Sequence, residues 1–96
     1  MARRLCLITG ASAGIGAEFA RQYAALGWDL ALTARRIDRL EALAKELETT
    51  HGISAITIAE DLARPEAVDA ILAALAAKDR HVDALVNNAG YGLPGT

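Results

Sequence analysis

The sequence predicts an α/β fold built on a doubly wound parallel sheet. Short apolar runs alternate with longer stretches of helical periodicity, and most changes of pattern are marked by glycine or proline. Strands that alternate with helices of ten or more residues form βαβ units, which have parallel strands and right-handed crossovers. Four strands and three helices are expected from the pattern. The doubly wound arrangement places the strands in the order 3-2-1-4.

Start and stop signals separate the expected elements. Gly27 and Gly52 end the first two helices as C-caps, and Pro65 opens the third, because proline is favourable in a first helical turn. The expected strands cover residues 4–9, 29–34, 53–59 and 82–87, and the expected helices cover 15–26, 37–50 and a segment from 65 onward. Apolar residues at helical spacing are Ile15, Phe19, Tyr23 and Leu26 in the first helix, Leu40, Leu43 and Leu47 in the second, and Val68, Ile71, Leu72 and Leu75 as the inward face of the third.

The composition is that of an ordinary globular domain. The chain has 96 residues, of which 53% are hydrophobic and 23% charged, and its formal charge is −2. This acidic balance argues against a nucleic-acid or anionic-membrane partner. The first apolar run, residues 5–8, is too short for a secretion signal, and no stretch approaches the length of a membrane span. A cytoplasmic location is therefore expected.

Few residues offer reactive or metal-binding side chains. Cys6 is the sole cysteine and lies within an apolar run, so it is expected to be a reduced core residue. His51 and His81 flank loops that are far apart in the chain, without acidic or cysteine ligands at a suitable spacing. We expect both histidines on the surface and propose no metal site.

The most informative segment is the glycine loop, residues 9–16 (TGASAGIG), between the first strand and the first helix. Gly10 allows the sharp turn, Gly14 lets the backbone approach a pyrophosphate, and Gly16 lets the helix pack closely on the strand. The following helix N-terminus offers free N–H groups and the positive end of its dipole to phosphates. The spacing is G-x-x-x-G-x-G, which is neither the G-x-G-x-x-G fingerprint nor a P-loop.

Together with two later segments, this loop resembles the short-chain dehydrogenase/reductase family, in its single-domain branch with a TGxxxGIG loop. The later segments are Asp61-Leu62 after the third strand and residues 87–90 (NNAG) after the fourth. The three landmarks span the chain in the order and spacing of the family. The resemblance implies a Rossmann-type fold, with residues 1–96 as the N-terminal portion of a single NAD(P)-binding domain.

The resemblance also implies that residues of all three segments bind a dinucleotide. The loop would surround the pyrophosphate and the adenosine ribose. Asp61 would accept a hydrogen bond from the adenine amino group, with Leu62 against the ring. Asn87, Ala89 and Gly90 would line the cofactor near its ribose units, and the pair Asn87-Asn88 would tie the fourth strand to its neighbours. The loop residues concerned are Gly10, Ser12, Ala13, Gly14, Ile15 and Gly16.

The end of the second strand favours NADP(H) over NAD(H). An NAD site places an acid there to hold the ribose 2′-hydroxyl, and an acid would repel a 2′-phosphate. This chain has Ala34 followed by Arg35 and Arg36, and a guanidinium can grip phosphate oxygens in a fork. Many NADP-preferring relatives also carry a basic residue where this chain has Ala13, although Ser12 offers a hydroxyl there. The alternative, that the arginines are simply solvated residues before a helix, suits Arg36 better than Arg35.

No catalytic residue is assigned. The family uses a tyrosine with a lysine four residues later, but the residues four positions after Tyr23 and Tyr91 are Gly27 and Gly95. We therefore expect the N-terminal piece of a longer oxidoreductase, which would act on a small carbonyl or alcohol substrate and would be inactive in isolation. The alternatives are a non-catalytic nucleotide-binding module and a minimal structural half-fold. The fourth strand would be an exposed edge that favours self-association, and homo-oligomerisation of the parent stays open.

Overall fold

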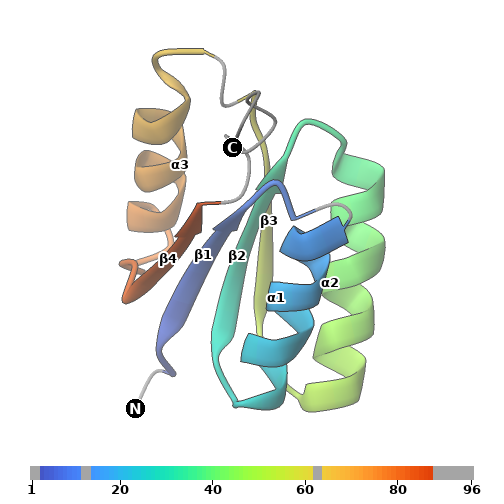
Figure 1. The fold of residues 1–96 in the computed structure, drawn as a ribbon. Helices are drawn as coiled ribbons and strands as arrows, with labels where there is room; N and C mark the ends of the chain where they lie inside the picture. The colour runs from blue at the N-terminus through green and yellow to red at the C-terminus, as the bar shows by residue number, and fades with distance from the viewer. Residues whose placement is uncertain (1–2, 12–13, 62–63, 88–96) are drawn as a thin grey trace.

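A computed structural model describes residues 3–11, 14–61 and 64–87, which form one parallel sheet flanked by helices (Figure 1). The strand order is β3-β2-β1-β4, and all neighbouring strands are parallel, which confirms the predicted doubly wound α/β topology. In chain order the elements are β1 (Leu5–Thr9), α1 (Gly14–Ala25), β2 (Asp29–Ala34), α2 (Ile37–His51), β3 (Ala55–Ala59), α3 (Ala67–Ala76) and β4 (Ala84–Asn87).

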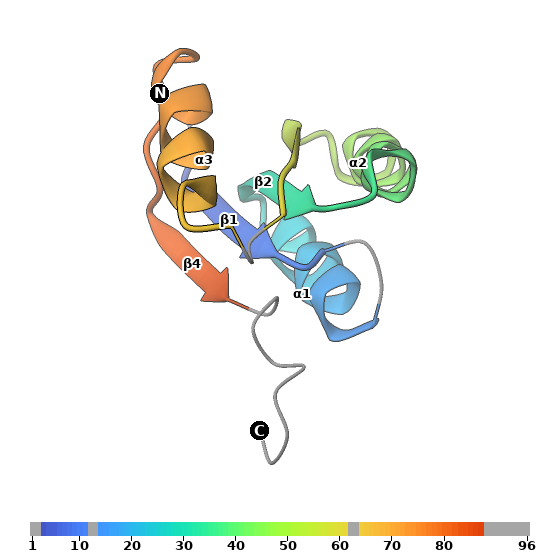
Figure 2. The ribbon, with the colours of Figure 1, turned by 90° about the horizontal axis from the view of Figure 1, so that it is seen from above.

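Helices cover both faces of the sheet. Seen from above, α1 and α2 lie on one side and α3 lies on the other (Figure 2). The central strands β1 and β2 are buried along their whole length, whereas β3 and β4 are only partly buried. Central strands of a parallel sheet are buried on both faces, which explains why both strands read as nearly continuous apolar runs in the sequence.

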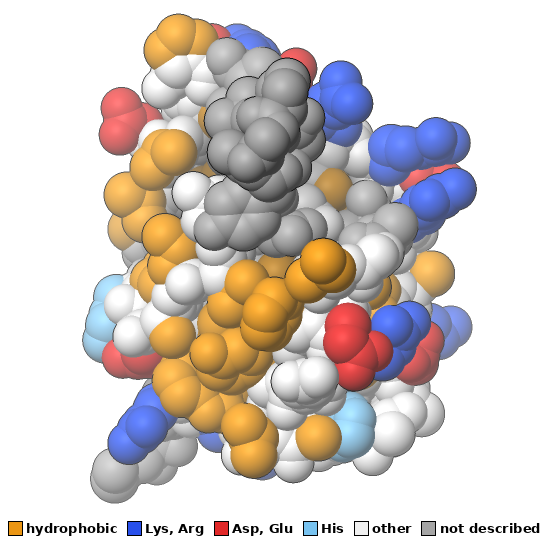
Figure 3. Space-filling view, viewed as in Figure 1, with side chains coloured by type: hydrophobic (Ala, Val, Ile, Leu, Met, Phe, Trp, Pro, Cys, Tyr) orange, Lys and Arg blue, Asp and Glu red, His pale blue; other side chains and the backbone are white. Residues whose placement is uncertain are grey.

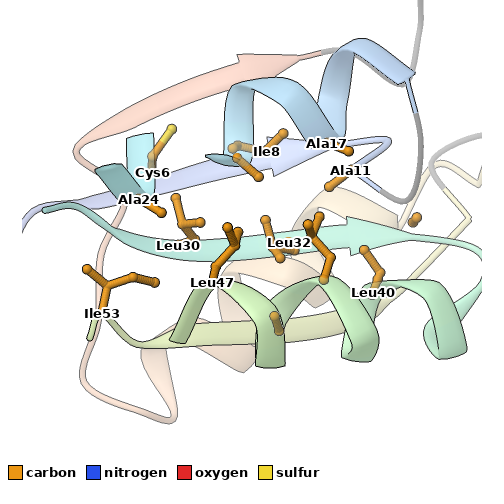
Figure 4. Packing of buried hydrophobic residues seen from close by; sticks show 14 residues of the cluster. Cys6, Ile8, Ala11, Ala17, Ala24, Leu30, Leu32, Leu40, Leu47 and Ile53 are labelled. Carbon is orange, nitrogen blue, oxygen red and sulfur yellow. The ribbon is translucent and has the colours of Figure 1, made fainter. Parts of the chain in front are cut away.

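Alternate residues of the central strands build two cores. Cys6, Ile8, Leu30 and Leu32 pack with α1 and α2, and the labelled side chains converge between these layers in Figure 4. The residues between them point to the opposite face, where they pack against α3. That second cluster consists of Leu5, Leu7, Ala31, Ile71 and Leu75.

The inward face of α1 differs from the large residues that its spacing singled out. Ile15, Phe19 and Leu26 are 67%, 38% and 74% exposed. The buried residues of α1 are all small: Gly16, Ala17, Ala20 and Ala24. Small side chains let the helix backbone approach the sheet closely, so the bulky apolar residues lie along its outer flank.

Of the four residues predicted on the inward face of α3, two are buried and two are exposed. Ile71 and Leu75 are buried as expected, but Val68 and Leu72 are 56% and 48% exposed. Ala67 is buried in their place. Only one side of α3 touches the sheet, and this helix is apolar on more than that side.

Two strands begin two residues later than predicted, and a carboxylate explains each difference. The backbone N–H of Ser54 donates to Asp29 Oδ1 at 2.9 Å, immediately before β3 begins at Ala55. The backbone N–H of Leu5 donates to Asp83 Oδ2 at 2.8 Å, immediately before β4 begins at Ala84. In both cases a side-chain oxygen takes the place of a strand carbonyl.

The amino ends of the strands carry a further ion-pair network. Arg80 Nη1 donates to Asp29 Oδ2 at 3.1 Å, and its Nη2 donates to the carbonyl of Arg3 at 3.1 Å. The Asp29 side chain is only 7% exposed. Nearby, the Trp28 ring contacts Tyr23 edge-on, with the ring centroids 5.2 Å apart, and the Arg4 guanidinium lies 5.6 Å from the centre of the indole. The segment before β1, the start of β2 and the loop before β4 are thereby joined.

None of the helices in the described residues has the length and hydropathy that a membrane crossing requires. Cys6 is fully buried, as expected, and burial raises the pKa of its thiol to about 11. It is therefore a protonated core residue at neutral pH. His51 and His81 are both exposed.

Candidate functional site

The four strands end at one edge of the sheet, and the segments that the sequence singled out lie there. The parallel registers pair Thr9 with Thr33 and with Asn87, and Ala34 with Ala59. From β1 the chain adds β2 and then β3 on one side of the sheet. It then returns to the other side of β1 to form β4, so the strand order changes direction at β1. Open parallel sheets bind ligands at such a point, beyond the carboxyl ends of the strands.

The turn from β1 to α1 has backbone geometry suited to a phosphate. Gly10 and Gly14 have φ values of 65° and 64°, in the left-handed region that favours glycine. A Cβ added at Gly14 would meet no heavy atom within 4 Å, so the space next to this backbone is open. The N–H of the buried Ala11 donates to the carbonyl of Thr33 at 3.2 Å, which ties the turn to β2.

Helix α1 has its positive end after the glycine turn. It begins at Gly14, and its first turn carries no acidic side chain. The free N–H groups and the dipole of that turn therefore face the strand ends without a negative charge from the same turn. Ile15 is exposed there, and Gly16 is buried against the sheet. Ser12 and Ala13 lie outside the described residues.

The end of β2 carries positive charge. Ala34 is buried, and the arginines that follow it are exposed. Arg36 is the N-cap of α2, with extended backbone angles of φ −102° and ψ 105°. Each ion pair between described residues uses another basic side chain, so neither Arg35 nor Arg36 has a carboxylate partner within the described part of the chain.

The ends of β3 and β4 complete the edge. The N–H of Glu60 donates to the carbonyl of Ala34 at 3.1 Å, and the N–H of Arg64 donates to the carbonyl of Asp61 at 2.9 Å. Asp61 is therefore at the start of a turn beside the end of β2, and it is partly buried. Leu62, Asn88, Ala89 and Gly90 lie outside the described residues.

One side-chain contact across this edge involves a residue to which the motif comparison assigned no role. The Thr9 hydroxyl donates to Asn87 Oδ1 at 3.0 Å and to the carbonyl of Val86 at 3.4 Å. Asn87 therefore ties β4 to β1, as the resemblance implied. The signal for Thr9 was its place as the first residue of the TGxxxGIG loop.

The structure thus gathers the described members of all three segments at one sheet edge. The open backbone of Gly14 follows β1, and after β2 come Arg35 and Arg36, which form no ion pair with another described residue. A family model for short chain dehydrogenases matches residues 4–96. This chain belongs to the short-chain dehydrogenase family.

Individual relatives of this chain support the family assignment. It is 45% identical over 86 residues to a sulfoacetaldehyde reductase from Chromohalobacter salexigens, a match that covers 90% of the chain and 33% of the relative. It is 47% identical over 88 residues to a serine 3-dehydrogenase from Agrobacterium fabrum, covering 91% of the chain and 33% of the relative. The chain therefore spans about a third of the length of these curated relatives.

Solved structures show the same architecture. L-sorbose reductase from Gluconobacter frateurii, complexed with NADPH and L-sorbose, superposes with a TM-score of 0.89 at 38% identity, over 99% of this chain and 36% of that one. A metagenomic short-chain oxidoreductase in complex with NADP superposes with a TM-score of 0.86 at 38% identity, over 99% of this chain and 42% of that one. The chain thus shares the fold of the corresponding part of oxidoreductases that were solved with NADPH or NADP bound.

Proposed function

We propose that this chain binds NADP(H) and is the cofactor-binding, N-terminal portion of an oxidoreductase that reduces a small carbonyl compound or oxidises the corresponding alcohol. The observation that carries the choice of cofactor is the end of β2, where buried Ala34 replaces an acid and exposed Arg35 has no carboxylate partner among the described residues. The solved relatives bound to NADPH or NADP support this choice.

The residues at the strand ends fit the parts of the cofactor. The open backbone at Gly14 and the uncompensated start of α1 suit the pyrophosphate. In the proposal, Arg35 holds the 2′-phosphate, Asp61 holds the adenine amino group, and Asn87 borders the ribose units. The nicotinamide ring supplies the hydride when the cofactor is bound. Since the printed sequence has no tyrosine followed four residues later by lysine, we assign the proton transfer to the whole protein and not to these residues.

Equilibrium binding of NADPH and NADH tests the cofactor choice. A hydrogen bond to a charged group contributes roughly 1.5–3 kcal/mol, so Arg35→Ala should weaken NADPH binding about ten- to a hundredfold and leave NADH binding nearly unchanged. Arg36→Ala is the comparison at the next position, and we expect a smaller effect than for Arg35→Ala because, in the proposal, Arg36 contributes its charge without a hydrogen bond to the 2′-phosphate. If Arg35→Ala retains the wild-type preference, Arg35 does not read the 2′-phosphate.

The assignment of chemistry to the whole protein has its own test. The chain of 96 residues should bind the cofactor and catalyse no hydride transfer to simple carbonyl compounds, measured as consumption of NADPH. Turnover by this chain alone would show that it contains a proton donor outside the tyrosine–lysine pattern.

A further inference from the structure

A third unpaired arginine lies one helical turn beyond the two at the end of β2. Arg39 is in the first turn of α2, three residues after the N-cap Arg36, and its side chain is exposed. Like Arg35 and Arg36, it takes part in no ion pair with any other described residue. In Figure 3 the Lys and Arg side chains gather at the upper right, over the start of α2.

Arg39 faces the helix whose N-terminus is at the proposed phosphate site. It lines a pocket of about 230 Å³ between α1 and α2, together with Ala17 of α1 and Leu43 of α2. Ala17 is only three residues after Gly14, where α1 begins. Arg39 and Ala17 therefore line the end of this groove that is nearer the starts of the two helices.

The only carboxylate that lines this pocket is already paired with another arginine. Arg21 Nε lies 3.5 Å from Glu46 Oε2, and Arg21 Nη1 lies 4.0 Å from Glu18 Oε1. Glu46 thus pairs with Arg21, which also lies near Glu18, and Arg39 has no carboxylate within ion-pair distance among the described residues. Its neighbour Asp38 offsets one of the three charges of Arg35, Arg36 and Arg39, which leaves an excess of positive charge at the start of α2.

We propose that Arg39 is a further specificity-determining residue, which favours the 2′-phosphate of NADP(H) over the 2′-hydroxyl of NAD(H) through its charge. This inference rests on the proposed function. A 2′-phosphate carries about −1.5 to −2 charges, whereas a hydroxyl carries none, so a nearby cation stabilises one cofactor and not the other. For an exposed and partly screened charge this contribution is modest, and we expect about a three- to tenfold preference.

Calorimetric titration with two adenosine fragments tests the proposal without any catalytic assay. Adenosine 2′,5′-bisphosphate carries the distinguishing phosphate, and adenosine 5′-monophosphate does not. Arg39→Gln and Arg39→Met should each lower the preference for the bisphosphate about three- to tenfold. Arg39→Lys should keep most of it, because lysine keeps the charge. Added salt should shrink the difference between wild type and the neutral variants, because it screens exposed charges.

Two control variants separate a local effect from a general one. Lys78→Gln removes the same charge beyond the end of α3, at the opposite edge of the sheet, and should leave the preference unchanged. The double variant Arg21→Gln/Glu46→Gln removes the paired charges from the same pocket with no net change of charge, and should also leave it unchanged. Circular dichroism of each variant checks that the helices are retained.

The outcomes separate this inference from the proposed function. If the wild type does not prefer the bisphosphate, the choice of NADP(H) is wrong and the role of Arg39 falls with it. If the wild type prefers it and Arg35→Ala removes the preference, but both neutral Arg39 variants stay within about twofold of wild type, the role of Arg39 alone is refuted. A loss with Arg39→Lys equal to that with Arg39→Gln would also refute the charge-based role.

Discussion

At the scale of single residues, the burial of Cys6 makes the free energy of unfolding depend on pH in the alkaline range. Burial on the central strand raises the pKa of this thiol from its ordinary value of 9.0 to about 11. An unfolded chain loses the proton near pH 9 while the folded chain keeps it. The stabilisation is therefore complete below pH 9 and declines as the pH rises towards 11. The free energy of unfolding should fall in this window by up to about 1.4 kcal/mol per pH unit.

Urea unfolding at a series of pH values, followed by circular dichroism, measures this effect. Cys6→Ala is the control, because it lacks the thiol and keeps every other titratable group. The wild type should lose stability faster than the variant between pH 9 and 11. Parallel curves for the two proteins would mean that the thiol titrates alike in the folded and unfolded chains.

Residue by residue, the sequence predicted the parts of the site that depend on local backbone patterns. The positive φ value at Gly10 agrees with the sharp turn expected there, whereas the binding roles of the site residues stay predictions. The hydrogen bond from Thr9 to Asn87 links residues 78 positions apart in the chain. Whether Arg39 has an ion-pair partner among the described residues depends on which arginine Glu46 contacts. Long-range pairing of this kind is not contained in motif spacing.

At the scale of elements, the strand order was predictable because few topologies satisfy right-handed crossovers. The face that α1 turns to the sheet was not predictable from its apolar spacing. Spacing gives weight to bulky residues such as Phe19, whereas a helix that packs closely on a sheet buries small ones such as Ala20. The first residues of β3 and β4 could not be predicted either, because carboxylates of Asp29 and Asp83 replace strand carbonyls there.

A pair of variants in α1 tests this packing. Ala20 is fully buried, so Ala20→Leu should overpack the contact with the sheet and lower the free energy of unfolding by about 1–3 kcal/mol. Phe19→Ala, at a side chain that is 38% exposed, should cost less. Chemical denaturation of both variants provides the comparison. A larger cost for Phe19→Ala would mean that α1 buries its bulky residues instead.

At the scale of the whole molecule, the two edges of the sheet have different tasks. The carboxyl edge gathers the proposed cofactor site, and the amino edge is held together by Asp29 and Arg80, which contact each other at 3.1 Å. Arg80 also reaches the carbonyl of Arg3, and Asp29 also accepts from Ser54. Segments from both ends and the middle of the described chain therefore meet at the amino edge.

Removing one partner of this pair should destabilise the whole fold. Arg80→Ala removes the nearer of two arginines beside the carboxylate of Asp29, which is 7% exposed, and leaves Arg3 at 4.0 Å, so the free energy of unfolding should fall by about 1.5–3 kcal/mol. Arg64→Ala is the control, because both partners of the Arg64–Glu66 pair are more than half exposed and such a pair contributes less than about 1 kcal/mol. Thermal unfolding measures both.

Adding Asp29→Asn to Arg80→Ala should recover part of the loss, because no buried charge then lacks a partner. Equal losses for Arg80→Ala and Arg64→Ala would contradict the structural role of the buried pair.

The position of Trp28 offers a way to follow unfolding of the amino edge separately from loss of the cofactor. It is the sole tryptophan of the chain, and its ring contacts Tyr23 and Arg4 at the amino edge. Its fluorescence will therefore report the entry of water at that edge. The emission of a reduced nicotinamide ring would instead report on the carboxyl edge. A single sample thus carries two optical signals, which distinguish loosening of the scaffold from loss of the ligand.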